Sequence, residues 1–320
     1  MSDTNLETTQ ENKTQEAIAE FAKKLSYAIE NDNLPFSKNS MEEPFNPKTG
    51  YPYGGSNNVM LKMVSGEKGY DDPRWLTFNE GKELGGTVMK GEKATKLLIL
   101  DRDGSSRLTF KYFNVFNANQ FKGLNLPPIE KNDMPFADRQ SQFASAKADH
   151  EASNPREFAK NEYSKLSHES RVALIKEIGD QMTMSRIGDS SIGKISEANK
   201  QFAKEWLDLL KTPEGQREAV FISNDAFKEF KYQMQFDPVK DVKHEPIKDK
   251  VKEERVPNRE DAATAGIKSE TLARASDLVQ KEERTLGSNA KEKQERATAP
   301  ENTAPDKSTR TRAKPKELTR

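Results

Sequence analysis

The sequence predicts an α+β fold: a small antiparallel sheet with flanking helices, followed by a helical region and a disordered C-terminal tail. Three observations support this prediction. Eleven of the 25 aromatic residues lie between Pro44 and Leu124, where short runs alternate between apolar and polar residues as strands do. Apolar residues recur at helical spacing before this segment and again between Ala137 and Met234. From Asp237 onward there is no aromatic residue.

The N-terminal part is expected to contain a disordered stretch, a helix and a loop. Residues 1–13 are polar and are expected to be disordered. The segment from Thr14 to Asn31 predicts an amphipathic helix, because its apolar residues fall on one stripe. The run from Pro44 to Gly55 is rich in Pro and Gly, which excludes regular structure and predicts a loop.

Short elements are expected after this loop. Ser56 is placed to cap a short helix. Thr77 and Glu80 form a capping box and Gly85 supplies a left-handed stop, so a two-turn helix is expected over residues 78–84. Strands are expected over residues 87–90, 95–100 and 108–116, and a turn over residues 101–104 joins the last two in a hairpin.

Alternation along the last of these strands divides its side chains between two faces. Phe110 and Tyr112 are expected on the buried face with Leu108. Lys111 and Phe113 are out of phase with them and are expected on the exposed face. An aromatic ring and a cation would then share one accessible surface.

The second half of the chain is expected to be a helical region over residues 137–236, in which Ser167 and Thr212 are placed as N-caps. In residues 237–320, Leu, Ile, Val and Phe make up only 11 of 84 residues. So few apolar side chains cannot offset the entropy of ordering the chain, and a disordered charged tail is expected.

Composition excludes several classes of function. The chain has no cysteine, which rules out disulfides, thiolate metal sites and cysteine nucleophiles. No apolar run approaches the ~20 residues that span a bilayer, and the polar N-terminus lacks the apolar core of a signal peptide. We therefore expect a cytoplasmic protein without membrane contact. Residues 48–122 hold 12 basic and 8 acidic side chains, a net charge of +4 that is compatible with a polyanion.

Five ordered blocks carry a family resemblance: Asn46-Pro-Lys-Thr-Gly50, Tyr53-Gly-Gly-Ser-Asn57, Pro73-Arg-Trp-Leu-Thr-Phe78, Leu84 to Lys93, and Phe113-Asn-Val-Phe-Asn117 with Gln120. They resemble the N-terminal, single-stranded-DNA-binding domain of ArdC-type anti-restriction proteins, which is also found in plasmid primases. The resemblance implies such a domain over residues 14–136. Gly54 stands where that family usually has Arg, which removes one phosphate contact.

In that family a zincin-like metalloprotease domain often follows. Residues 137–236 would be its degenerate remnant, or else this branch never had that domain. The His-Glu pairs at His150 and His168 each lack the second histidine of H-E-x-x-H, and the remaining histidine, His244, lies in the tail. Zinc hydrolysis needs two imidazoles one helical turn apart and a third ligand. We therefore expect no metal, no cofactor and no catalysis.

Candidate nucleic-acid contacts are the residue types that grip a single strand, since aromatic faces stack on unpaired bases and cations bind the phosphates. Lys90 and Lys93 stand out, because they lie beside Gly91 in a turn where backbone amides can approach a phosphate. The full set of candidates is Lys48, Tyr53, Asn57, Lys62, Arg74, Trp75, Lys90, Lys93, Lys111, Phe113 and Asn117.

Ordinary structural roles remain open for the same residues. Large aromatics in a small domain, here Tyr53, Trp75, Phe78 and Phe116, are more often core than binding residues. Arg74 can pair with Asp71 or Asp72, and the two asparagines can serve as turn or capping residues. The lysines beside Gly91 can equally form a solvated hairpin tip.

Together these observations predict a non-enzymatic protein that binds single-stranded DNA and is of the anti-restriction type, protecting incoming plasmid or mobile-element DNA. The alternative is an accessory interaction protein of the conjugation or replication machinery. Its helical region and tail would recruit an enzyme of that machinery, and its DNA binding would be vestigial. The histidine count argues against a third reading, a metalloprotease.

Overall fold

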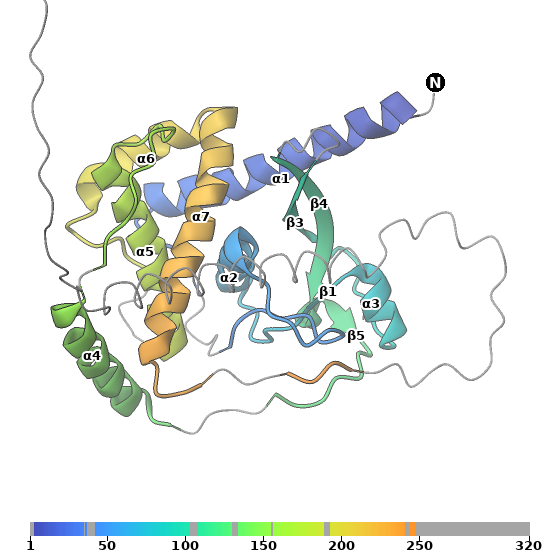
Figure 1. Ribbon diagram of the computed structural model, residues 1–320. Helices are drawn as coiled ribbons and strands as arrows, with labels where there is room; N and C mark the ends of the chain where they lie inside the picture. The colour runs from blue at the N-terminus through green and yellow to red at the C-terminus, as the bar shows by residue number, and fades with distance from the viewer. Residues whose placement is uncertain are drawn as a thin grey trace, which may run out of the picture. The chain divides into compact units, whose positions relative to one another are not determined.

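The computed structural model describes residues 3–34, 36, 42–102, 108–129, 134–154, 156–188, 193–240 and 244–247. The fold is α+β as predicted, with small antiparallel sheets and flanking helices (Figure 1). None of the helices in these ranges is long and apolar enough to cross a bilayer. The tail expected over residues 237–320 lies outside the described residues from residue 248 onward.

Helix α1 spans Asp3–Glu30 and is longer than expected. The expectation of disorder over residues 1–13 is wrong from Asp3 onward, while residues 1 and 2 lie outside the described part. The extension is compatible with the sequence, because no Pro or Gly interrupts the helix, and the Thr14 hydroxyl donates to the Gln10 carbonyl one turn earlier. Ile18 and Leu25 lie on the buried stripe that the periodicity predicts.

Helix α2 spans Gly55–Lys68, and its cap differs from the predicted one. Gly54, not Ser56, is the N-cap residue, and it makes no side-chain cap bond. The cap comes instead from helix α7 (Pro213–Gln233), whose Asn224 Oδ1 accepts a hydrogen bond from the Ser56 amide at 2.6 Å. A free helix N-terminus needs acceptors, and here a residue far away in the chain supplies one.

Three strands form the larger sheet, in the order β1 (Trp75–Leu76), β4 (Leu108–Asn117) and β3 (Thr95–Arg102). All pairs are antiparallel, and the predicted hairpin is confirmed by the β3–β4 register, in which Leu97 faces Phe113. Residues 103 and 104 of the expected turn lie outside the described residues.

The predicted division of β4 into a buried and an exposed face is wrong. Phe113 packs against the hydrophobic core, and Val115 on the same face is fully buried. Phe110 and Tyr112 on the other face pack against the same core. Helices α1 and α2 both contact the hairpin. Alternation along β4 therefore does not separate core from solvent.

A second, two-stranded sheet pairs β2 (Thr87–Val88) with β5 (Phe121–Lys122), after the 3-10 turn Ala118–Gln120. Helix α3 (Phe78–Glu83) contacts β2 and starts with the predicted Thr77–Glu80 capping box. Gly85 ends it with φ +81° as expected. Gly81 is required for its packing, since a Cβ there would lie 2.2 Å from the Phe121 ring.

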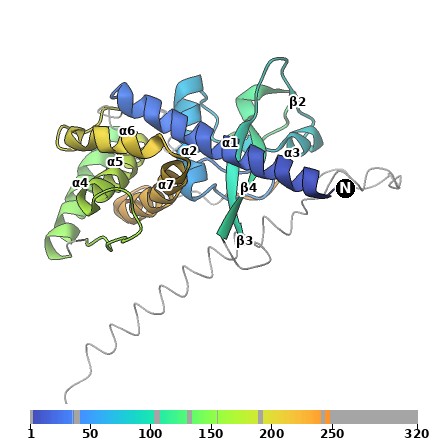
Figure 2. The ribbon, with the colours of Figure 1, turned by 90° about the horizontal axis from the view of Figure 1, so that it is seen from above.

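The described part of the second half contains the helices α4 (Phe136–Ser153), α5 (His168–Ile187), α6 (Ala203–Leu210) and α7, with 3-10 turns at Lys200–Phe202 and Met234–Phe236. The N-caps predicted at Ser167 and Thr212 are confirmed. Helix α7 contacts α1, α2 and α5 (Figures 1 and 2), so one apolar cluster contains side chains from both halves.

Candidate nucleic-acid interface

Three of the predicted contact residues are fully buried: Lys62, Trp75 and Asn117 are each 0 % exposed. Trp75 packs edge-to-face against Tyr70, with ring centroids 5.9 Å apart. Lys62 Nζ lies 5.7 Å from the centroid of Phe230. These side chains build the interior, so they do not reach a ligand at the surface.

Asn117 has the capping role that was left open for it. Its side chain accepts from the Asn119 amide, and the Gln120 side chain accepts in turn from the Asn117 amide. Asn117 Nδ2 also donates to the carbonyl of Asp72 at 2.7 Å, which ties the strand end to the loop before β1.

Tyr53 and Asn57 also stabilise the fold. The Tyr53 hydroxyl donates to the Trp75 carbonyl at 3.2 Å, and burial, with the Glu80 charge as a lesser cause, raises the pKa of this hydroxyl above its usual value. Asn57 donates to the Leu98 carbonyl at 2.7 Å and accepts from the Leu98 amide at 2.9 Å. Its amide thereby takes the place of a neighbouring strand along the outer edge of β3.

Three predicted cations are already neutralised by carboxylates. Arg74 Nε lies 2.9 Å from an Asp72 oxygen, and Arg74 Nη1 donates to the Pro127 carbonyl at 2.6 Å. The alternative in which Arg74 pairs with an aspartate is therefore confirmed. Lys48 pairs with Glu83, and Lys111 pairs with Asp101 at 2.5 Å. A phosphate would have to displace these partners.

Lys90 and Lys93 differ from the other candidates. Both are exposed, and neither forms an ion pair within the described part of the chain. They flank a turn in which the Glu92 amide donates to the Met89 carbonyl and Gly91 has φ +91°. Gln120 Nε2 donates to the Lys93 carbonyl at 2.9 Å, which holds the turn against the 3-10 segment.

Further exposed groups lie on the elements next to this turn. Phe78 is 55 % exposed on α3, with Lys82 one turn later, and Lys122 is the register partner of Thr87. Tyr51 is 56 % exposed on the loop that Asn46 Nδ2 ties to Glu80 of α3 at 2.9 Å. We call this set of exposed side chains on neighbouring elements the α3 corner; it comprises Tyr51, Phe78, Lys82, Lys90, Lys93 and Lys122.

Sequence reasoning missed Tyr51, Lys82 and Lys122. One signal was available for Lys82: it follows Phe78 by four residues on a two-turn helix, so the two side chains lie on one face. The pairing of Lys122 with β2 had no local signal, since two-residue strands are too short to show alternation.

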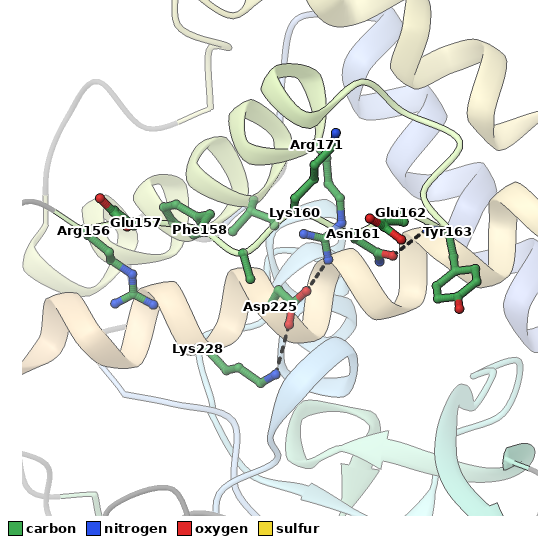
Figure 3. Close-up of a pocket in the computed structure, with 12 residues that line it drawn as sticks. Arg156, Glu157, Phe158, Lys160, Asn161, Glu162, Tyr163, Arg171, Asp225 and Lys228 are labelled. Atoms are coloured by element: carbon green, nitrogen blue, oxygen red, sulfur yellow. Dashed lines mark hydrogen bonds and ion pairs between the residues drawn. The ribbon is translucent and has the colours of Figure 1, made fainter. Parts of the chain in front are cut away.

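The helical half holds a cavity of about 540 Å³ between residues 156–163 and helices α5 and α7 (Figure 3). Its cations are largely paired: Arg171 and Lys228 both contact Asp225 (Figure 3), and Arg156 Nε lies 2.9 Å from Glu229. Among the described residues, no group of three or more His, Asp or Glu side chains could hold a metal ion.

The DNA primase TraC of Escherichia coli is 30 % identical over a segment that covers 28 % of this chain and 10 % of the primase. The chain thus spans about a tenth of that relative's length.

Two crystal structures of the antirestriction protein ArdC from plasmid R388, one metal-free and one Mn(II)-bound, are 22 % identical to this chain. Each match covers 68 % of this chain and 97 % of that one, with TM-scores of 0.46 and 0.47. The sequence-family model for the N-terminal domain of anti-restriction factor ArdC matches residues 14–120. These residues include all five sequence blocks and most of the α3 corner. Residues 14–120 are therefore similar to the N-terminal domain of anti-restriction factor ArdC.

Proposed function

We propose that this protein binds single-stranded DNA through the α3 corner and acts, without catalysis, as an anti-restriction factor of plasmid or mobile-element DNA. The observation that carries the proposal is the set of exposed cations beside exposed aromatic rings within and next to the family segment. Lys82, Lys90, Lys93 and Lys122 form no ion pair among the described residues, whereas most other cations of this half do.

The chemistry of this surface suits a single strand better than a duplex. Phe78 and Tyr51 can stack on unpaired bases, and such stacking tolerates any sequence because every base has a π-face. The lysines can hold the phosphates between the stacked bases and release counterions as they do so. The named activities of the relatives, anti-restriction and DNA priming, support a role at DNA.

In this role the protein would be cytoplasmic and would coat an entering single strand. Restriction nucleases would then lack their duplex substrate until the complement is made. No step of this action requires bond breaking, so a surface that binds DNA is sufficient.

The test is a titration of the full chain with a fluorescent single-stranded oligonucleotide and with the matching duplex, at two salt concentrations. We expect tighter binding to the single strand and an affinity that falls with salt, because cation–phosphate contacts release counterions. Equal binding to both forms, or no binding at the lower salt concentration, would refute the proposal.

A second candidate function is the recruitment of a conjugation or replication protein by the helical half. Tyr163 favours it: this ring is 95 % exposed at the edge of the 540 Å³ cavity, where an aromatic anchor suits a protein partner. A pull-down with the full chain and its Tyr163→Ala variant distinguishes the two functions. Loss of a bound partner in the variant, with unchanged oligonucleotide binding, would favour recruitment.

A further inference from the structure

The segment 244–247 lies against the loop that precedes the α3 corner. Ile247 donates its amide to the Pro47 carbonyl at 3.0 Å, and His244 Nε2 lies 3.1 Å from a Glu42 carboxylate oxygen. These contacts bring a part of the chain that follows α7 back to the first family block, which begins at Asn46.

The contact between His244 and Phe45 is a parallel stack. The two ring centroids are 3.6 Å apart and the planes differ by 3°. Side-chain rings in proteins usually meet edge-on or offset, at centroid distances of about 4.5–7 Å. A parallel, closely overlapped arrangement is instead how a base lies on an aromatic side chain.

Gly50 makes room for this segment. A Cβ on Gly50 would lie 2.2 Å from the His244 carbonyl oxygen, so the backbone of residue 244 sits where any other side chain would begin. Gly50 also has φ +73°, a conformation that favours glycine. The seat on the loop therefore fits a flat group and the backbone that follows it.

This seat adjoins the proposed DNA surface. Phe45 precedes Asn46, whose side chain binds Glu80 of α3, and Lys48 on the same loop pairs with Glu83 of α3. A strand that stacks a base on Phe45 could continue toward Tyr51 and Phe78 without leaving the loop and helix that these bonds join.

We propose that the outer face of Phe45 is a base-stacking subsite for single-stranded DNA, and that His244 occupies it when no DNA is bound. This inference rests on the proposed function. The stacked imidazole is an intramolecular competitor of the DNA base. The apparent affinity for DNA is therefore the intrinsic affinity multiplied by the fraction of molecules in which His244 does not cover Phe45.

The first test compares oligo-dT affinity of the full-length protein with that of two variants at His244. His244→Ala removes the competitor, and we expect an increase in affinity of about fivefold or more, in line with the contribution of one stacked base. His244→Trp retains a flat ring and should show no increase. Adding Phe45→Leu to His244→Ala, which keeps an apolar side chain but removes the ring, should abolish the increase.

The second test observes the stack directly. The imidazole protons of His244 lie over the Phe45 ring, whose current shifts their NMR resonances upfield, and only two other histidines contribute signals. We expect this shift to disappear when oligo-dT is added.

Two outcomes separate failure of this inference from failure of the proposed function. If the wild-type chain binds oligo-dT while His244→Ala binds no more tightly and the upfield shift persists, the inference is overturned and the function stands. If neither the wild-type protein nor His244→Ala binds oligo-dT, both are overturned.

Discussion

The lysines of the α3 corner differ from the other cations of the N-terminal half in whether a carboxylate partner must be displaced before a phosphate can bind. Arg74 and Lys111 already hold carboxylates, and binding a phosphate would cost them those contacts. Lys90 and Lys93 carry no such partner within the described residues. The free energy of a new phosphate contact is therefore not offset by a broken ion pair at these two positions.

Replacing Lys90 and Lys93 together by Ala should weaken single-strand binding and lower the slope of log affinity against log salt. Each lost phosphate contact on a single strand reduces that slope by about 0.7, so we expect a change of about 1–1.5. Lys111→Ala is the matched control, because Lys111 is 60 % exposed but paired, and it should leave the slope unchanged. If Lys111→Ala lowers the salt slope and the double substitution of Lys90 and Lys93 does not, the phosphates bind along the β3–β4 hairpin instead.

Replacing Phe78 by Ala should weaken binding by about 1–3 kcal/mol while leaving the salt slope nearly constant, since stacking involves no counterion release. The melting temperature should change little, because the ring is 55 % exposed. Tyr27→Ala on α1, where the ring is 67 % exposed, controls for the general loss of a surface aromatic. Equal losses from both variants would show that Phe78 has no specific role.

Residue types were predictable from the sequence, but exposure was not. The aromatic and basic residues between Pro44 and Leu124 correctly marked the family segment. Trp75 and Lys62 are nevertheless buried and Phe113 packs against the core, because segments distant in the sequence cover these side chains. Local alternation cannot report packing by segments that are distant in the sequence.

At the scale of elements, α3 and the β2–β5 pair hold the α3 corner in shape. The capping box at Thr77 and Glu80 was predictable, since both bonds form within four residues. The cap of α2 by Asn224 was not, because its two partners are 168 positions apart. Local hydrogen bonds can be read from a sequence, and tertiary ones cannot.

Gly81→Ala should destabilise the protein although it replaces glycine within a helix. Helix propensity alone would stabilise by about 1 kcal/mol. The added Cβ would meet the Phe121 ring at 2.2 Å, and overpacking of this kind typically costs about 1–3 kcal/mol. Thermal unfolding measures the balance, with Asn79→Ala on the exposed side of α3 as the control. A rise in melting temperature for Gly81→Ala would show that α3 and β5 can move apart freely.

At the scale of the whole molecule, one apolar cluster joins the family segment to the helical half. Val59 and Met63 of α2 belong to the same cluster as Ile222 and Phe230 of α7. Periodicity in a sequence can mark the apolar stripe of a helix, but a stripe does not name the helix that it packs against. The domain boundary predicted between residues 136 and 137 therefore remains a prediction from the sequence resemblance. The hydrophobic core contains side chains from both sides of it.

A protein truncated after residue 136 should lose cooperative unfolding, because it exposes the faces of α1 and α2 that pack on α7. A protein truncated after residue 247 keeps every described element and should melt close to the full-length temperature. Circular dichroism of both proteins tests this. A sharp transition at the full-length temperature for the shorter protein would mean that the family segment folds alone.

Chelation should not change the stability of the protein. The described residues contain no cluster of three metal ligands, and metal binding at a structural site contributes folding free energy directly. We expect equal melting temperatures with and without EDTA. A marked decrease with EDTA, reversed by added Zn²⁺ or Mn²⁺, would contradict this expectation.

The most direct test of the central claim is photo-crosslinking of a thymine oligonucleotide to the full-length protein, followed by peptide mapping of the adducts. We predict adducts on the α3 corner, at Tyr51, Phe78 and the peptide that carries Lys90 and Lys93. Adducts confined to the helical half, around the cavity at residues 156–163, would contradict it.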